Sequence, residues 1–377
     1  MGVDPERAAW VALAMVPAIG PERMKHLIDA CGSATGALSA PVAFLGTVKA
    51  MSPAAATAVR QASIEGGAQV ISRAEAMGAV VLLPRDPGFP ELLEQIPHMP
   101  PVLFALGNLA LIERPAVAIV GSRDHSGYGE EVADQVGRVA ASAGLVVVSG
   151  MARGLDAVAH AAALDVGGGS IGVLGNGLGV IYPAANRRLY ERMAEKGLLL
   201  TEFPPGERPA VHTFPRRNRL ISGLARVTVV IEAAEGSGTM STVDEATRQG
   251  RTVMAVPGPI TSRTSVGTNR LLRDGAQPLL EPLDLLEHYP EHRRLAGTPV
   301  AAAKGSPVRA ATPVPIPEDL PAAEHRLAVA LQAGGQDFDG LIRVAGLTPA
   351  EALAALSGLE LRGLIRQDPG RVEWARN

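Results

Sequence analysis

The chain has 377 residues, with 35 lysines and arginines against 38 aspartates and glutamates, and a formal net charge of −3. This balance excludes a generally basic nucleic-acid coat protein, so any site for a polyanion has to be local. The single cysteine, Cys31, excludes an intramolecular disulfide and a cysteine-based zinc cluster. The length indicates two or three domains. We find no leader-like segment and no apolar run of about eighteen residues, so we expect a cytoplasmic protein without a membrane segment.

Residues 1–65 are rich in alanine and predict a small helical domain. Gly20 and Pro21 interrupt two of its helices, which is typical of a short helical hairpin. The segment resembles the helix-hairpin-helix and sterile-alpha-motif-like domains, and in the first of these the turn donates backbone N–H groups to DNA phosphates. A purely structural or protein-contacting helical domain is the alternative.

Residues 66–290 predict an α/β core. After a helix near residues 68–77, short runs of the buried-strand type alternate with helix-patterned segments. The expected strands are residues 80–83, 102–106, 117–120, 145–148, 171–174, 198–201, 227–231 and 253–256. This alternation favours a doubly wound parallel sheet, in which ligand-binding loops follow the carboxyl ends of the strands.

The last third of the chain divides into a linker and a tail. Residues 291–321 carry several prolines among small residues and predict an extended linker. Residues 322–377 predict three helices, near residues 322–332, 337–345 and 349–362, and then a hairpin, which together suggest a winged helix. The third helix carries Glu351 and Glu360 but only one arginine, so we expect it to bind a protein partner instead of a DNA groove.

Two loops of the core carry the features of a phosphate site. Gly121, Ser122 and Arg123 follow the strand at 117–120, and residues 149–154, with Arg153, follow the strand at 145–148. Small residues let a ligand approach the backbone, while helix N-termini and arginines attract anions. The alternative is that the glycines only make tight turns.

The densest group of cations is the run Arg216, Arg217, Asn218 and Arg219, which follows Pro215 at the start of a predicted helix. Arg216 and Arg219 share a helix face because they are three positions apart. Cations in a first turn oppose the helix dipole, and a bound anion reverses that penalty. Salt bridges to Glu202 or Glu232 are the alternative.

Asp156 and His160 lie four positions apart at the start of the helix that follows Gly154. Two interpretations stay open: local capping hydrogen bonds, or orientation of Arg153 and its loop. Neither a serine nor a cysteine is placed by spacing as a nucleophile for His160, so catalysis is not indicated.

Two further loops complete the expected cleft, one with Gly175 and Asn176 and one with Ser237, Gly238 and Thr239. Tyr182, Phe203 and Phe214 are candidate platforms for base stacking or members of the core. The first loop lacks the G-x-G-x-x-G pattern, and no acidic residue is placed to hold a ribose. We therefore expect no NAD, no other cofactor and no metal.

Taken together, these motifs resemble the DNA-processing protein A (DprA/Smf) family. The matching segments run in order through residues 120–123, 149–160, 173–186, 214–224, 229–246, 250–258 and 267–276. The resemblance implies a Rossmann-like core that binds single-stranded DNA, a homodimer, and loading of the RecA recombinase onto incoming DNA during natural transformation. It also implies flanking N-terminal helical and C-terminal winged-helix domains.

The resemblance assigns DNA-binding roles to residues of the cleft. We expect the site to comprise Gly121, Ser122, Arg123, Ser149, Gly150, Arg153, Gly154, Asp156, His160, Gly175, Asn176, Arg216, Arg217, Asn218, Arg219, Ser237, Gly238 and Thr239. Some members carry lysine at position 153, a difference that keeps the charge and changes the contact geometry.

The competing interpretation is an enzyme. The same fold resembles the nucleotide phosphoribohydrolases, whose motif is G-G-x-G-T-x-x-E, and residues 236–239 align with its first part. The position of the catalytic glutamate is Thr242 here, so we expect no enzymatic activity.

Overall fold

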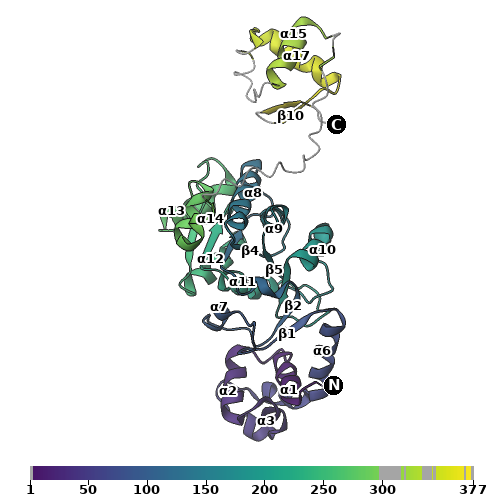
Figure 1. Cartoon of the computed structure of the whole chain (residues 1–377), viewed down its shortest axis with the longest axis vertical. Helices are drawn as coiled ribbons and strands as arrows, with labels where there is room; N and C mark the ends of the chain where they lie inside the picture. Colours follow the sequence, from purple (N-terminus) through teal and green to yellow (C-terminus); the bar gives the residue numbers. More distant parts are fainter. Residues whose placement is uncertain are drawn as a thin grey trace. The chain divides into compact units, whose positions relative to one another are not determined.

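The computed structural model describes residues 3–296, 316–317, 320–332, 342, 345–368 and 371–374. The chain divides into two compact units, Met1–Thr298 and Pro299–Asn377, and each is described by itself. Figure 1 shows the helices and strands of both. None of the helices in the described ranges is long and apolar enough to cross a membrane.

The chain begins with the expected group of helices. They are α1 (Pro5–Ala14), α2 (Pro21–Cys31), α3 (Ala34–Ser39), α4 (Val42–Leu45), α5 (Pro53–Gln61) and α6 (Ile64–Ala76). Gly20 is the N-cap of α2, as the sequence predicts, and the side chain of Ser63 caps α6. Gly67 of α6 packs directly on Ala8 of α1, where a Cβ atom would lie 1.9 Å from the Ala8 carbonyl oxygen. Helix α6 therefore packs on α1 although most of it lies beyond the expected domain boundary at residue 65. The four-part division of the chain remains a proposal.

The core is one nine-stranded sheet in the order β1-β2-β6-β5-β4-β3-β7-β8-β9. Its strands are β1 (Val80–Leu82), β2 (Leu103–Gly107), β3 (Ala116–Val120), β4 (Val146–Ser149), β5 (Ser170–Val173), β6 (Leu198–Thr201), β7 (Val227–Val230), β8 (Thr252–Ala255) and β9 (Gln277–Pro278). Strands β3 to β9 are parallel, which confirms the predicted doubly wound α/β class. The exception lies at one edge of the sheet, where β2 pairs antiparallel with both β1 and β6.

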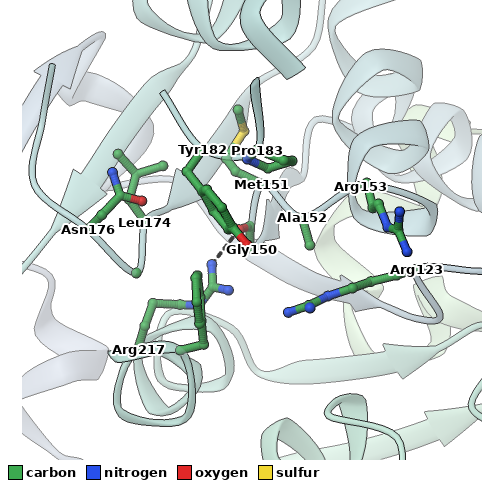
Figure 2. Close-up of a pocket in the computed structure, with 12 residues that line it drawn as sticks. Arg123, Gly150, Met151, Ala152, Arg153, Leu174, Asn176, Tyr182, Pro183 and Arg217 are labelled. Atoms are coloured by element: carbon green, nitrogen blue, oxygen red, sulfur yellow. Dashed lines mark hydrogen bonds between the residues drawn. The ribbon is translucent and has the colours of Figure 1, made fainter. Parts of the chain in front are cut away.

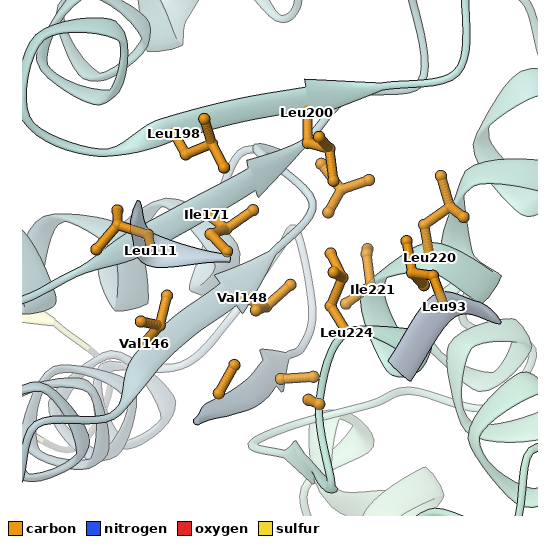
Figure 3. Packing of buried hydrophobic residues seen from close by; sticks show 14 of the residues in the cluster. Leu93, Leu111, Val146, Val148, Ile171, Leu198, Leu200, Leu220, Ile221 and Leu224 are labelled. Carbon is orange, nitrogen blue, oxygen red and sulfur yellow. The ribbon is translucent and has the colours of Figure 1, made fainter. Parts of the chain in front are cut away.

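Helices cover both faces of this sheet, which is why the central strands read as continuous apolar runs. On one face, α11 (Thr213–Gly223) packs over β4, β5 and β6 through Leu220 and Ile221, together with Leu93 of α7 (Glu91–Glu94) (Figure 3). On the other face, α8 (Gly127–Ser142) and α9 (Leu155–Asp165) pack against β3 and β4. With both faces buried, ligands can reach the sheet only at its edges and ends.

The strand order reverses at β3. Its next strand in the chain, β4, lies on one side of it, and β7 lies on the other. In open parallel sheets such a switch point leaves a crevice between the loops at the carboxyl ends of the two strands. The topology therefore places the loops after β3 and β7 on either side of a ready-made cleft.

The second unit has the expected winged-helix elements in its described part. They are α15 (Ala322–Gln332), α17 (Pro349–Leu361) and the antiparallel hairpin of β10 (Ile365–Asp368) and β11 (Arg371–Trp374). Thr348 and Glu351 form a capping box that starts α17. The helix expected at residues 337–345 and the linker expected at 291–321 fall largely outside the described residues, and residues 291–296 belong to α14 (Pro290–Ala296).

Candidate functional site

Two adjoining cavities lie at the carboxyl ends of β3 to β7. The smaller has a volume of about 300 Å³ and the larger about 560 Å³. Residues shared by both walls are Arg123, Ala152, Tyr182, Phe214 and Arg217. In Figure 2 the guanidinium groups of Arg123 and Arg217 point into the smaller cavity from different elements, and Arg153 lies beside Arg123.

Arg217 forms the floor of the site. Only 4% of its surface is exposed, and its Nη1 donates to the backbone carbonyls of Gly150 and Val173. A Cβ atom at position 150 would lie 2.6 Å from that Nη1, so a larger residue than glycine there would displace the guanidinium group. Burial lowers the pKa of Arg217 to about 10, with Asp156 opposing and Arg123 adding to the shift. The guanidinium group therefore keeps its positive charge at neutral pH in the wall of both cavities.

The loop after β4 is held by side chains on both its N–H groups and its carbonyls. Asp156 Oδ2 accepts from the Gly150 N–H at 3.0 Å and the Ala152 N–H at 3.4 Å. Asn186 Nδ2 donates to the carbonyls of Met151 and Ala152, each at 3.0 Å. Burial raises the pKa of Asp156 although Arg217 lowers it. Of the two open interpretations, the structure supports orientation of the loop by Asp156, and the N-cap of α9 is Gly154.

Gly154 also brings the first two loops together. Its φ is +82°, a conformation that other residues rarely adopt, and a Cβ atom would lie 2.5 Å from the Ser122 carbonyl oxygen. A glycine at this position therefore lets the loops after β3 and β4 touch, so that Arg123 and Arg153 emerge side by side.

These two arginines are exposed, unlike Arg217. Arg153 is 61% exposed in its side chain and forms an ion pair with Asp124 at 3.0 Å. Arg123 makes no ion pair with any described residue, and its Cζ atom lies 5.9 Å from the centre of the Phe214 ring. Phe214 in turn lies 5.5 Å from the Tyr182 ring, which is 45% exposed. The cavity thus combines cations with accessible aromatic surface.

The loop after β7 closes the larger cavity. Ser237, Gly238 and Thr239 line it, and Thr239 Oγ1 donates to the Gly121 carbonyl at 3.1 Å. Asn218 lines it as well and donates to Ser241 Oγ at 2.6 Å. Thr242 also lines this cavity, so the position that would carry a hydrolase glutamate presents a hydroxyl.

The structure brings most of the predicted residues to the cavity walls. Those that line one or both cavities are Gly121, Ser122, Arg123, Gly150, Arg153, Asp156, Gly175, Asn176, Arg217, Asn218, Ser237, Gly238 and Thr239. Those that line neither are Ser149, Gly154, His160, Arg216 and Arg219.

Arg216 and Arg219 correct the expectation that the whole arginine run faces an anion. Both bind Glu202, whose side chain is only 1% exposed. Arg219 donates to its two oxygens at 2.8 Å each, and Arg216 donates at 3.1 Å. Arg216 and Arg219 share a helix face as predicted, and that face binds Glu202, the salt-bridge partner named as the alternative. Helix α11 also begins before Pro215 instead of after it.

Ser149 and His160 were expected at the binding site, but both are fully buried and line neither cavity. Their hydrogen bonds hold neighbouring elements together. Ser149 Oγ donates to the Ile119 carbonyl at 2.6 Å, which ties β4 to β3. His160 Nδ1 lies 2.7 Å from Ser170 Oγ, and burial lowers the pKa of His160 to about 3. His160 is therefore neutral at any physiological pH.

Some cavity residues carried little sequence signal. Asp124 directly follows Arg123 but stands in no recognisable motif. Tyr182 and Phe214 are in the cavity wall, whereas Phe203, the third candidate platform, is buried at 6% exposure. The residues next to each ring in the sequence do not predict which ring lines the cavity, because that depends on which loops meet in the fold.

Comparison with known proteins identifies the family of this chain. A family model described as DNA recombination-mediator protein A matches residues 80–290, and the DprA winged helix domain matches residues 310–371. The chain belongs to the DprA/Smf family. Protein Smf of Synechocystis sp. is 32% identical over 392 aligned residues, covering 97% of this chain and 98% of that protein. The match therefore extends through both units.

Solved structures of DprA proteins share the fold. DNA processing protein A from Streptococcus pneumoniae superposes with a TM-score of 0.65 and 31% identity, over 76% of this chain and 98% of that one. DprA from Helicobacter pylori, described in terms of its single-stranded DNA binding mode, has a TM-score of 0.52 and 28% identity. It covers 56% of this chain and 96% of its own.

Proposed function

We propose that this DprA/Smf protein is a recombination mediator that binds single-stranded DNA in the two cavities at the carboxyl edge of its sheet. One observation carries the proposal: Arg123, Arg153 and Arg217 converge from three elements on one concave surface. Within the described residues, Arg153 is the only one of these three that lies within ion-pair distance of a carboxylate. A phosphate supplies the charge that this surface lacks.

The neighbouring aromatic rings favour a single strand over a duplex. Tyr182 and Phe214 border both cavities and present ring surface beside the guanidinium groups. Unpaired bases can stack on such rings, whereas a duplex hides its base faces. Stacking without base-edge readout tolerates any sequence, which suits a protein that handles DNA of arbitrary origin.

The proposed biological role rests on membership in the family. We infer that the protein protects incoming single strands in the cytoplasm and loads RecA onto them during natural transformation. Membership in the family and the similarity to a DprA described by its single-stranded DNA binding mode support this inference. The site acts by holding phosphates, so no catalytic step is part of the proposal.

We also infer a homodimer through the core. Exposed apolar side chains gather near the β9 edge of the sheet, with Leu280 75% exposed and Leu283 50% exposed. Such surface is characteristic of an interface between protein chains. Light scattering of the core would give twice the monomer mass.

Titration of a labelled single-stranded oligonucleotide and its duplex tests the DNA-binding proposal. The single strand is expected to bind more tightly, with an affinity that falls as salt rises. Tyr182→Ala should weaken single-strand binding by about 1–3 kcal/mol through lost stacking. Tyr128→Ala is the matched control, since Tyr128 is 46% exposed and outside both cavities. Tighter duplex binding, or equal effects of both variants, would contradict the proposal.

A further inference from the structure

We propose that Asp124 is an internal competitor for the phosphate at Arg153 and sets how readily a bound strand leaves the cleft. This inference rests on the proposed single-strand binding. It concerns a residue that opposes binding, although it stands in the middle of the cationic loops.

The geometry makes Asp124 unusual among the residues of the site. Its side chain is 86% exposed, yet its carboxylate lies 3.0 Å from Arg153. It lines the larger cavity, and the other carboxylate in these walls, Asp156, is buried and engaged by backbone N–H groups. Asp124 is therefore the one carboxylate of the described cavity walls that is exposed to solvent, and its partner is Arg153.

The backbone around Asp124 is fixed, so the side chain stays close to Arg153. Ser122 Oγ donates to the Asp124 carbonyl at 2.7 Å and accepts from its N–H at 3.2 Å. Within the described residues, the Asp124 carboxylate has no hydrogen-bond or ion-pair partner besides Arg153, so its loss leaves no buried group unpaired.

The consequence is a competition for one guanidinium group. A phosphate that reaches Arg153 has to share it with Asp124 or displace the carboxylate, and in either case two anions lie close together. A solvent-exposed pair of this kind stabilises by less than about 1 kcal/mol, so the competition weakens binding without preventing it. Since variants of one binding site differ in affinity mostly through their dissociation rates, we expect the effect mainly on the dissociation rate. Fast release suits a protein that hands its strand to another.

The test compares Asp124→Asn with wild type by titration and stopped-flow dissociation of a labelled single-stranded oligonucleotide. Asparagine keeps the shape of the side chain and removes its charge. We expect the Kd to fall about three- to fivefold, mostly through slower dissociation, and the difference to shrink as salt screens the charges. Asp134→Asn makes the same change of net charge on α8, where Asp134 pairs with Arg138 outside both cavities, and should leave the Kd within about 1.5-fold.

A double-mutant cycle assigns the effect to Arg153. In an Arg153→Ala background, Asp124→Asn is expected to change the Kd by less than about 1.5-fold. A full gain in that background would overturn the proposal, since Asp124 would then act by repulsion alone. An unchanged Kd for Asp124→Asn, with normal binding by wild type, would also overturn it while leaving the proposed function intact. Absence of single-strand binding by wild type would overturn both.

Discussion

The two sides of helix α11 show how one run of arginines serves two purposes. On one side Arg217 faces the cavities and donates only to backbone carbonyls and an amide. On the other side Arg219 is paired with both oxygens of the buried Glu202, and Arg216 adds a second contact to that carboxylate. The first side retains positive charge for a ligand, while on the second side the Glu202 carboxylate offsets one of the two arginine charges within the fold. Charge counted along the sequence therefore overstates the charge that a ligand meets.

The largest effect we expect is on the free energy of unfolding, and it comes from the side of α11 that binds Glu202. Glu202→Gln removes a carboxylate that is 1% exposed and leaves the guanidinium of Arg219 buried with its charge unpaired. The free energy of unfolding, measured by urea titration, should fall by about 3–5 kcal/mol. Glu291→Gln breaks a half-exposed pair with Arg226, and because solvent screens such a pair the free energy of unfolding should barely change. A Glu202→Gln variant that keeps its stability but loses DNA affinity would contradict the stabilising role of this side of α11.

The next effect is on DNA binding and comes from arginines that line the cavities with Arg217. Arg123→Ala combined with Arg153→Ala should weaken single-strand binding by at least about 100-fold, because each charged hydrogen bond to phosphate contributes about 1.5–3 kcal/mol and two such bonds are lost. Both side chains are exposed, so the free energy of unfolding should change by less than about 0.5 kcal/mol. The control is Arg138→Ala with Arg192→Ala, which removes two partly exposed arginines that pair with Asp165 outside both cavities. Equal losses in the two double variants would indicate a general charge effect.

A third prediction concerns pH and the residues behind the cavity. The pKa of His160 is about 3 in the folded state against 6.5 as its ordinary value, so only the unfolded chain takes up a proton between these values. Stability is therefore fully present above pH 6.5 and is lost as pH falls, by about 2 kcal/mol from pH 7 to pH 5. Comparison of urea titrations for wild type and His160→Asn isolates this contribution, since the opposing shift of Asp156 is common to both. The same pH dependence in both proteins would show that His160 does not cause it.

The smallest effect is expected from the tail. Helix α17 presents Glu351 and Glu360 as exposed acids, which a polyanion would repel, and Leu353 is 57% exposed. A chain of residues 1–300 should therefore bind single strands within about threefold of the full chain, or less than about 1 kcal/mol. Titrations with single-stranded and duplex oligonucleotides check this. A tenfold loss of either affinity would make the tail a DNA-binding domain.

Much of the fold is readable from the sequence because the central strands are buried on both faces and stand out as apolar runs between helices. The direction of β1 and β2 is not, since a short apolar run is the same in either orientation. Strand β9 was missed because two residues, one of them Pro278, give no periodic pattern.

The parts of the site that consist of residues adjacent in the sequence could be predicted. The loops after β3 and β4 were predicted from glycines and arginines next to strand ends, and their meeting follows from the parallel sheet. The separate fates of Arg217 and Arg219 could not be predicted, because they depend on Gly150 and Glu202, which are distant in sequence and close only after folding.

The central claim is that the arginines facing the cavities bind phosphates of a single strand, and the salt dependence of binding tests it most directly. The logarithm of the affinity is measured against the logarithm of salt concentration for wild type and for the Arg123→Ala, Arg153→Ala double variant. Each neutralised phosphate of a single strand contributes a slope of about −0.7, so removal of two contacts should make the slope shallower by about 1.4. Identical slopes for the two proteins would contradict the claim, because the arginines would then release no counterions on binding.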